Sequence, residues 1–118
     1  MAEYFDRSGR AIALQDWARL WADPDYRILC KTDVSDRLRL VTVWEGFWPY
    51  AIVETPRRIF HTAAIHRRER ERDTFVEILA WYDTEAVAHA GHLNHLACAR
   101  EGHVFYKSRT CQRCGFVG

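Results

Sequence analysis

The middle of the chain holds four consecutive segments with the composition of β-strands, and this run constrains the fold more than any other feature. The segments are Tyr26–Thr32, Arg37–Trp44, Ile59–His66 and Thr74–Tyr82. Most of the connections between them are short, and strands joined in this way usually pair with their neighbours in the sequence. The run therefore predicts a four-stranded antiparallel meander.

Alternation within the segments indicates which side chains share a face of the sheet. In Arg37–Trp44, one face carries Leu38, Leu40, Thr42 and Trp44. In the last segment, Phe75, Leu79 and Trp81 are expected to share a face. Cys30 lies inside the first segment, and we interpret it as a small buried apolar residue.

Helical patterns precede and follow the strands. From Ala13 to Asp23, apolar residues at i, i+3, i+4 and i+7 predict a helix with one apolar face: Leu14, Trp17, Ala18 and Trp21. The N-cap position, Ala13, lacks a capping side chain, and Pro24 ends the helix. Thr84 is the expected N-cap of a second helix that reaches about Ala99. The predicted apolar stripe of this helix is Ala86, Val87, Ala90, Leu93 and Ala97.

The predicted fold class is α+β, because the order is helix, four strands, helix, and we expect the helices on one face of the sheet. The chain has 118 residues, of which 48% are hydrophobic, which suits one small domain. The predicted core domain covers residues 1–97. Residues 98–118 form a tail that is too short to bury a core of its own.

The tail carries the strongest motif of the chain: Cys111 and Cys114, separated by two residues and followed by glycine. This spacing is typical of half of a zinc knuckle. Cys98 and His103 complete a Cys3His set, which predicts a closed structural Zn²⁺ site without an open position for water. His95 is the alternative fourth ligand, because His95 and Cys98 are three positions apart on the second helix. A redox pair and unoccupied thiols are the other interpretations.

Three histidines follow one another at intervals of three on the predicted second helix: His89, His92 and His95. They lie away from the apolar stripe, and we interpret them as solvated side chains. The sequence contains none of the short motifs of α/β-hydrolases, zinc proteases or nucleotide-binding proteins. We therefore expect no enzymatic activity, no catalytic residue and no small-molecule substrate.

Two groups of side chains are candidates for binding a partner. The first is aromatic and lies in the long second connection: Phe47, Trp48 and Tyr50. Aromatic side chains in a loop are common anchors of protein interfaces, although they also fold back over a sheet. The second group is basic and lies beside the zinc motif: Lys107, Arg109 and Arg113. These side chains suit contacts with phosphates, or they balance the charge of the thiolates.

The overall charge favours a protein partner over nucleic acid. Lys and Arg number 17 against 16 Asp and Glu, which gives a net charge of +1, whereas nucleic-acid-binding domains are usually strongly basic. No apolar run approaches the roughly 20 residues of a membrane span, and the first residues lack the apolar centre of a signal peptide. We therefore expect a soluble cytoplasmic protein without a membrane partner.

Short motifs are spread over most of residues 4–92: Tyr4–Ile12, Trp17, Asp23–Arg27, Thr42–Gly46, Ile59–Thr62 and Tyr82–His92. This pattern resembles a group of small proteins encoded by actinobacterial phages and prophages. Some of those proteins have a similar zinc-type tail. Here Ala13 stands where they usually carry a Thr or Ser cap, and His61 stands where they often carry Glu. The resemblance implies phage origin and a small accessory role, and it assigns no catalytic residue. A role as a virion structural component is a further possibility.

Overall fold

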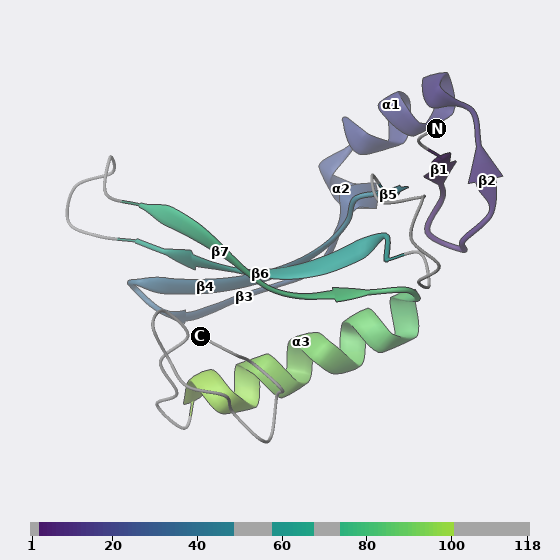
Figure 1. The fold of residues 1–118 in the computed structure, drawn as a ribbon. Helices are drawn as coiled ribbons and strands as arrows, with labels where there is room; N and C mark the ends of the chain where they lie inside the picture. The colour runs from purple at the N-terminus through teal and green to yellow at the C-terminus, as the bar shows by residue number, and fades with distance from the viewer. Residues whose placement is uncertain (1–2, 49–57, 68–73, 101–118) are drawn as a thin grey trace.

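A four-stranded antiparallel sheet with one long helix across it forms the body of the protein (Figure 1). The computed structural model describes residues 3–48, 58–67 and 74–100. The strands of this sheet, in their spatial order, are β3 (Ile28–Ser35), β4 (Leu38–Trp44), β6 (Phe60–His66) and β7 (Phe75–Tyr82). Every neighbouring pair is antiparallel. The predicted meander and the α+β fold class are confirmed.

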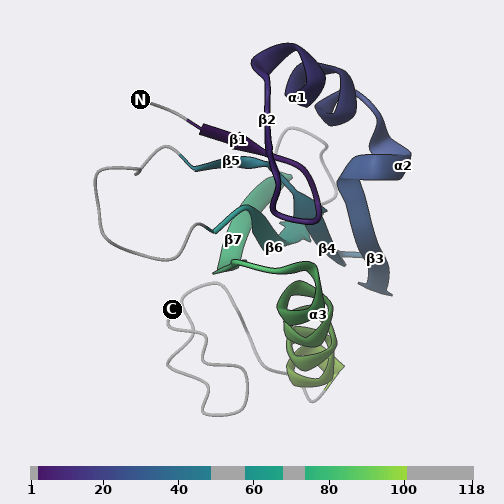
Figure 2. The ribbon, with the colours of Figure 1, turned by 90° about the vertical axis from the view of Figure 1, so that its right-hand side faces the viewer.

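The N-terminal part of the chain forms a second, three-stranded sheet that the sequence did not predict. Its strands are β1 (Glu3–Phe5), β2 (Ala11–Ile12) and β5 (Phe47–Trp48). Helices α1 (Leu14–Trp21) and α2 (Pro24–Arg27) follow β2, and α1 contacts β1. We call β1, β2, β5, α1 and α2 the N-terminal unit. It stands at one end of the large sheet, on the side opposite α3 (Glu85–Arg100), so the two predicted helices do not share a face (Figure 1 and Figure 2).

Local capping explains where the first helices begin and end. Ala13 occupies the N-cap of α1 without a side-chain hydrogen bond, as its residue type predicts. Asp23 then caps α2, because its carboxylate accepts a hydrogen bond from the backbone N–H of Asp25 at 3.0 Å. Pro24 suits the first turn of a helix, where no backbone donor is needed. This short helix replaces the start of the predicted strand, and β3 therefore begins at Ile28.

Helix α3 turns its histidines, and not the predicted apolar stripe, toward the large sheet. Its buried residues are Ala88, His92, His95, Leu96 and Cys98. Val87 and Leu93 are 49% and 65% exposed, so the predictions of an inward apolar stripe and of solvated histidines at 92 and 95 are wrong. Only His89 is exposed as expected. Small residues let the helix approach the aromatic rings of the sheet, where Ala88 joins Trp44 and Phe60 in the main core cluster.

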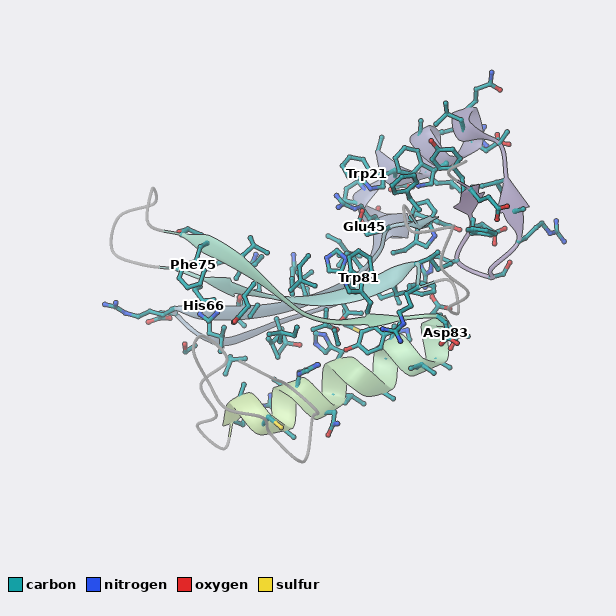
Figure 3. All side chains as sticks on the ribbon, in the orientation of Figure 1. Trp21, Glu45, His66, Phe75, Trp81 and Asp83 are labelled. Carbon is teal, nitrogen blue, oxygen red and sulfur yellow. The ribbon has the colours of Figure 1, made fainter. Side chains whose placement is uncertain are left out.

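An irregularity in the pairing of β6 with β7 separates two side chains that were expected to share a face. Thr62 pairs with Ala80, whereas Ala63 pairs with Ile78, so Leu79 is an extra residue of β7. Such a bulge reverses the alternation that follows it. Leu79 packs against the cluster beneath α3. Trp81 projects on the other side, toward Trp21 and Glu45 of the junction with the N-terminal unit (Figure 3).

The core consists of two clusters of buried apolar residues. The larger one joins the large sheet to both α3 and the N-terminal unit, and the smaller one lies between the sheet and α3. The buried members of the larger cluster are Phe5, Trp44, Ile59, Phe60, Tyr82 and Ala88. The smaller cluster contains Leu40, Ala64, Leu96 and Cys98. Because α3 continues to Arg100, the predicted boundary between residues 97 and 98 falls inside this helix. Cys30 is only half-buried in β3.

Candidate functional site

The face of the large sheet opposite α3 carries exposed apolar side chains. Thr62 points toward α3, so its neighbours His61 and Ala63 point to the opposite face. Ala63 pairs there with Ile78, Ile65 with Val76, and His61 with Trp81. Val76 is 62% exposed and Ile78 is 49% exposed. We call four of these side chains the open-face patch: Ile65, Val76, Ile78 and Trp81.

A carboxylate at the end of this face joins the two parts of the protein. Arg27 Nη2 donates a hydrogen bond to Glu45 Oε1 at 2.9 Å, and Trp21 Nε1 donates to Oε2 at 3.2 Å. Trp17 Nε1 donates to the backbone carbonyl of Glu45 at 2.7 Å. The guanidinium of Arg27 also lies 3.9 Å from the centroid of the Trp21 ring, within the range of a cation–π contact. Glu45 therefore fastens both α1 and α2 to the large sheet (Figure 3).

His61, a residue of β6, lies between the Glu45 carboxylate and the ring of Trp81 at this junction. Its Nδ1 is 3.7 Å from Glu45 Oε1, and its ring packs on Trp81 with 4.8 Å between the ring centroids. Burial lowers the pKa of His61, and the charge of Glu45 opposes this shift only in part. The imidazole is therefore neutral at pH 7. With Glu45 and Arg27 paired to each other, this arrangement suits a structural junction better than acid–base catalysis.

A second polar group is buried beneath α3. The ring of His92 lies between two threonines: Nε2 is 3.0 Å from Thr32 Oγ1, and Nδ1 is 2.8 Å from Thr42 Oγ1. Thr42 Oγ1 is 2.5 Å from Thr62 Oγ1, which also accepts a hydrogen bond from the hydroxyl of Tyr82 at 3.0 Å. The network thus joins α3 to all four strands of the large sheet.

With a neutral His92, every donor in this network has an acceptor, and all the hydrogen bonds run in the same direction along the chain of side chains. The hydroxyls of Tyr82, Thr62 and Thr42 each donate to the next acceptor, the last of which is His92 Nδ1, and Nε2–H then donates to Thr32. A charged imidazole has two N–H donors and no acceptor, so Thr42 loses its acceptor. Burial lowers the pKa of His92, and the neighbouring His89 lowers it further. Threonines at inward positions of three adjacent strands were the sequence signal for this network.

Cys30 and His89 form a pair at the open edge of β3. The Sγ atom of Cys30 lies 3.0 Å from His89 Nδ1. Burial raises the pKa of the thiol, while the charge of Arg7 lowers it in part. Arg7 itself is held by Glu85 and by the backbone carbonyl of Tyr26. The thiol is therefore protonated at neutral pH, which does not suit a nucleophile.

The predicted aromatic binding group takes part in the N-terminal unit. The ring of Phe47 lies 5.5 Å from that of Tyr4 and 6.3 Å from that of Trp17, measured between centroids. The backbone of Trp48 pairs with that of Glu3 in the small sheet. The side chain of Trp48 and the whole of Tyr50 lie outside the described residues. Phe47 thus packs against the fold, which was the alternative to an interface anchor.

The predicted zinc ligand Cys98 and the alternative fourth ligand His95 lie near the end of α3. Cys98 is fully buried, and His95, one turn earlier, is 2% exposed. Burial lowers the pKa of His95 to about 4, with a smaller contribution from His92. Within residues 3–48, 58–67 and 74–100, no three His, Cys, Asp or Glu side chains gather as a metal site. The other predicted residues of the tail lie outside these ranges: His103, Lys107, Arg109, Cys111, Arg113 and Cys114.

Comparison of the chain with protein-family models, with curated proteins and with solved structures finds no match. In the part of the chain that the structure describes, no helix combines the length and the apolar character that crossing a membrane requires. The function must therefore be argued from the surfaces and contacts of this chain.

Proposed function

We propose that this protein is a non-enzymatic binding module that engages another protein through the open-face patch. The observation that carries this proposal is the exposure of Val76 and Ile78 beside Ile65 and Trp81, on a part of the sheet face that the described residues leave exposed. Adjacent apolar side chains that remain exposed on a folded domain are typical of interaction sites. Trp81 is of the residue type that contributes most to protein interfaces.

The chemistry of the patch supports a protein partner over nucleic acid. Its four side chains carry no charge, and the whole chain has a net charge of only +1. Nucleic-acid binding depends on Lys and Arg that neutralise phosphates. A nucleic-acid role through Lys107, Arg109 and Arg113 is the alternative that the experiment below distinguishes.

The resemblance to proteins of actinobacterial phages supplies the biological setting of this proposal. The protein is then an accessory factor in the cytoplasm of the infected cell, and its partner is a host or phage protein. If the partner is another component of the phage particle, the protein is a virion structural component. Both roles use the same apolar surface, and the identity of the captured partner distinguishes them.

The experiment compares two double variants that place the same charges on opposite sides of the molecule. Val76→Asp/Ile78→Asp alters the open-face patch, and Val87→Asp/Leu93→Asp alters comparably exposed residues of α3. Full-length protein captures its partner from nuclease-treated host lysate, and titration then measures the dissociation constant for each variant. We expect the first variant to weaken binding at least about tenfold and the second to bind normally.

Three other results would contradict this proposal. Loss of binding only in the α3 variant would place the interface on the helix. Binding that disappears on nuclease treatment and falls steeply with salt would indicate nucleic acid. Full affinity in the Val76→Asp/Ile78→Asp variant, with circular dichroism like that of wild type, would exclude the open-face patch.

A further inference from the structure

We propose that this protein forms a symmetric dimer in which the β3 strands of two copies pair antiparallel along their outer edges. β3 lies at one side of the large sheet (Figure 2), and among the described strands its one neighbour is β4. The outer side of an edge strand presents backbone N–H and C=O groups that another strand can pair with. Two copies joined in this way form one continuous antiparallel sheet across a two-fold axis.

Two exposed side chains of opposite charge lie two positions apart on β3. Thr32 points toward α3, where its Oγ1 lies 3.0 Å from His92 Nε2. Its neighbours Lys31 and Asp33 therefore point to the other face of the sheet, and both are exposed. Asp33 also accepts a hydrogen bond from Arg39 Nε of β4 at 2.6 Å, which holds its carboxylate at the surface. The edge thus offers one cation and one anion to a second strand.

The spacing of these two charges makes β3 complementary to itself in one register. Side chains that oppose each other directly in an antiparallel pair lie on the same face of the sheet. With the two-fold axis at Thr32, Lys31 of each copy lies opposite Asp33 of the other copy, which gives two ion pairs. An axis at Lys31 or at Asp33 would place like charges opposite each other. Pairing with β4 is regular from Cys30 to Asp33, so this stretch of β3 is free of bulges.

Helix α3 presents a large apolar side chain along the same edge. The Nδ1 atom of His89 lies 3.0 Å from Cys30 Sγ, so this side of α3 lies over β3. Leu93 follows one turn later on that side and is 65% exposed. The preceding residue, His92, contacts Thr32, which places Leu93 close to the level of the two-fold axis. The Leu93 side chains of the two copies then face each other across the axis, and dimer formation covers both.

The opposite edge of the large sheet is not complementary to itself in charge. β7 carries one charged side chain, Glu77, whose Oε1 lies 3.1 Å from His66 Nε2. Two copies of β7 therefore offer no opposite charges to each other. The charges on β3 also disfavour pairing with apolar strands of other chains, so they select a second copy. The open-face patch lies on β6 and β7, and this inference does not rest on it.

The test compares two charge variants of the full-length protein by sedimentation velocity over a range of concentrations. Wild type should form a species of about twice the 13.9 kDa mass of one chain. Lys31→Glu makes the β3 edge acidic, and Asp33→Lys makes it basic. Each variant alone places like charges opposite each other and should dimerise at least about tenfold more weakly. An equimolar mixture should associate again, because the acidic edge of one variant then faces the basic edge of the other.

Three control variants locate the contact. Asp83→Lys makes the same charge change beyond the end of β7, and Val76→Asp/Ile78→Asp alters β7 itself, so both should dimerise like wild type. Val87→Asp/Leu93→Asp should dimerise more weakly, while the open-face patch of each chain still binds its partner.

Four outcomes would overturn the proposal. These are wild type that remains monomeric at every concentration, charge variants that dimerise like wild type, a mixture that fails to associate, and a dimer that only Val76→Asp/Ile78→Asp disrupts. Failure of the open-face patch to bind another protein changes none of these readouts, so the two proposals fail separately.

Discussion

Gly91 of α3 lies against the ring of Tyr82, the last residue of β7. A Cβ atom at position 91 would lie only 2.4 Å from Cε1, Cζ and Oη of that tyrosine. The ring is held in place because its hydroxyl donates to Thr62 Oγ1. We therefore expect Gly91→Ala to lower the free energy of unfolding by about 1–3 kcal/mol, as overpacked core positions do. Chemical denaturation measures this change.

The control for this variant separates the contact from the intrinsic helix preference of alanine. Ala90 is an exposed neighbour on the same helix, and Ala90→Gly should destabilise the protein by about 1 kcal/mol through helix propensity alone. If Gly91→Ala instead stabilised the protein by a similar amount, the close approach of α3 to Tyr82 would be refuted.

The buried His92 network predicts how stability depends on pH. The pKa of His92 is lowered in the folded protein, whereas an unfolded histidine titrates near 6.5. The unfolded chain therefore binds more protons below about pH 6.5, and the free energy of unfolding should fall as the pH decreases from there toward the folded pKa. Above about pH 6.5, titration of His92 should no longer change the free energy of unfolding.

The His92→Gln variant isolates the contribution of His92 to the pH dependence of stability, because the other histidines titrate in the variant and in wild type alike. We expect the slope of the free energy of unfolding between pH 7 and pH 5 to be smaller in the variant than in wild type. Urea titrations across this range measure both slopes. Equal slopes would show that His92 does not titrate during unfolding.

Glu45→Gln tests the junction between the N-terminal unit and the large sheet. The variant removes the charge that faces Arg27 in a largely buried pair, so it should lower the free energy of unfolding by about 1–2 kcal/mol. It should also lower the pKa of His61 further, because the Glu45 charge is what raises it. Denaturation measures the first effect, and an NMR titration of the His61 ring measures the second.

Asp33→Asn is the matched control for this carboxylate. Asp33 pairs with Arg39 on the exposed surface of the sheet, away from the junction. Its removal should affect stability less than Glu45→Gln does, and it should leave the pKa of His61 unchanged. An equal response of His61 to both variants would indicate a general charge effect and not the contact with Glu45.

If the tail binds zinc as its cysteine spacing predicts, removal of the metal should affect the tail and not the body of the protein. We expect a chelator to abolish amide hydrogen-exchange protection in residues 101–118 and to weaken it in the last turn of α3. Protection in β4 and β7 should survive, because both strands lie in a sheet held by its own core. Loss of protection in these strands would show that the metal stabilises the whole fold.

Local patterns predicted the strands well because each segment carries its own signal. Alternation in β4 placed Leu40, Thr42 and Trp44 on one face, and all three are buried there. The predictions that were wrong concern features that depend on other segments of the chain. The extra residue Leu79 becomes visible only when β7 is paired with β6. The N-terminal sheet joins residues far apart in the chain, such as Tyr4 and Phe47, through very short strands.

The positions of many candidate site residues depend on which side of α3 faces the large sheet. Its polar and apolar side chains are spread around the helix, so their periodicity alone gives little indication of which side faces the sheet. The sheet decided the orientation: Tyr82 accepts only a glycine opposite its ring, and Thr32 and Thr42 supply partners for a buried imidazole. That choice left Val87 and Leu93 exposed and brought His95 and Cys98 inside.

Short stretches of the sequence were enough to predict the fold class and the order of the strands in the meander, and they carry the cysteine spacing that predicts zinc. These features are encoded within short stretches of chain, where residue types and periods act directly on the backbone. Tertiary structure alone decided the open-face patch, the Glu45 junction and the burial of the α3 histidines. Each of these depends on the shape and polarity of a surface contributed by other segments, which no local pattern contains.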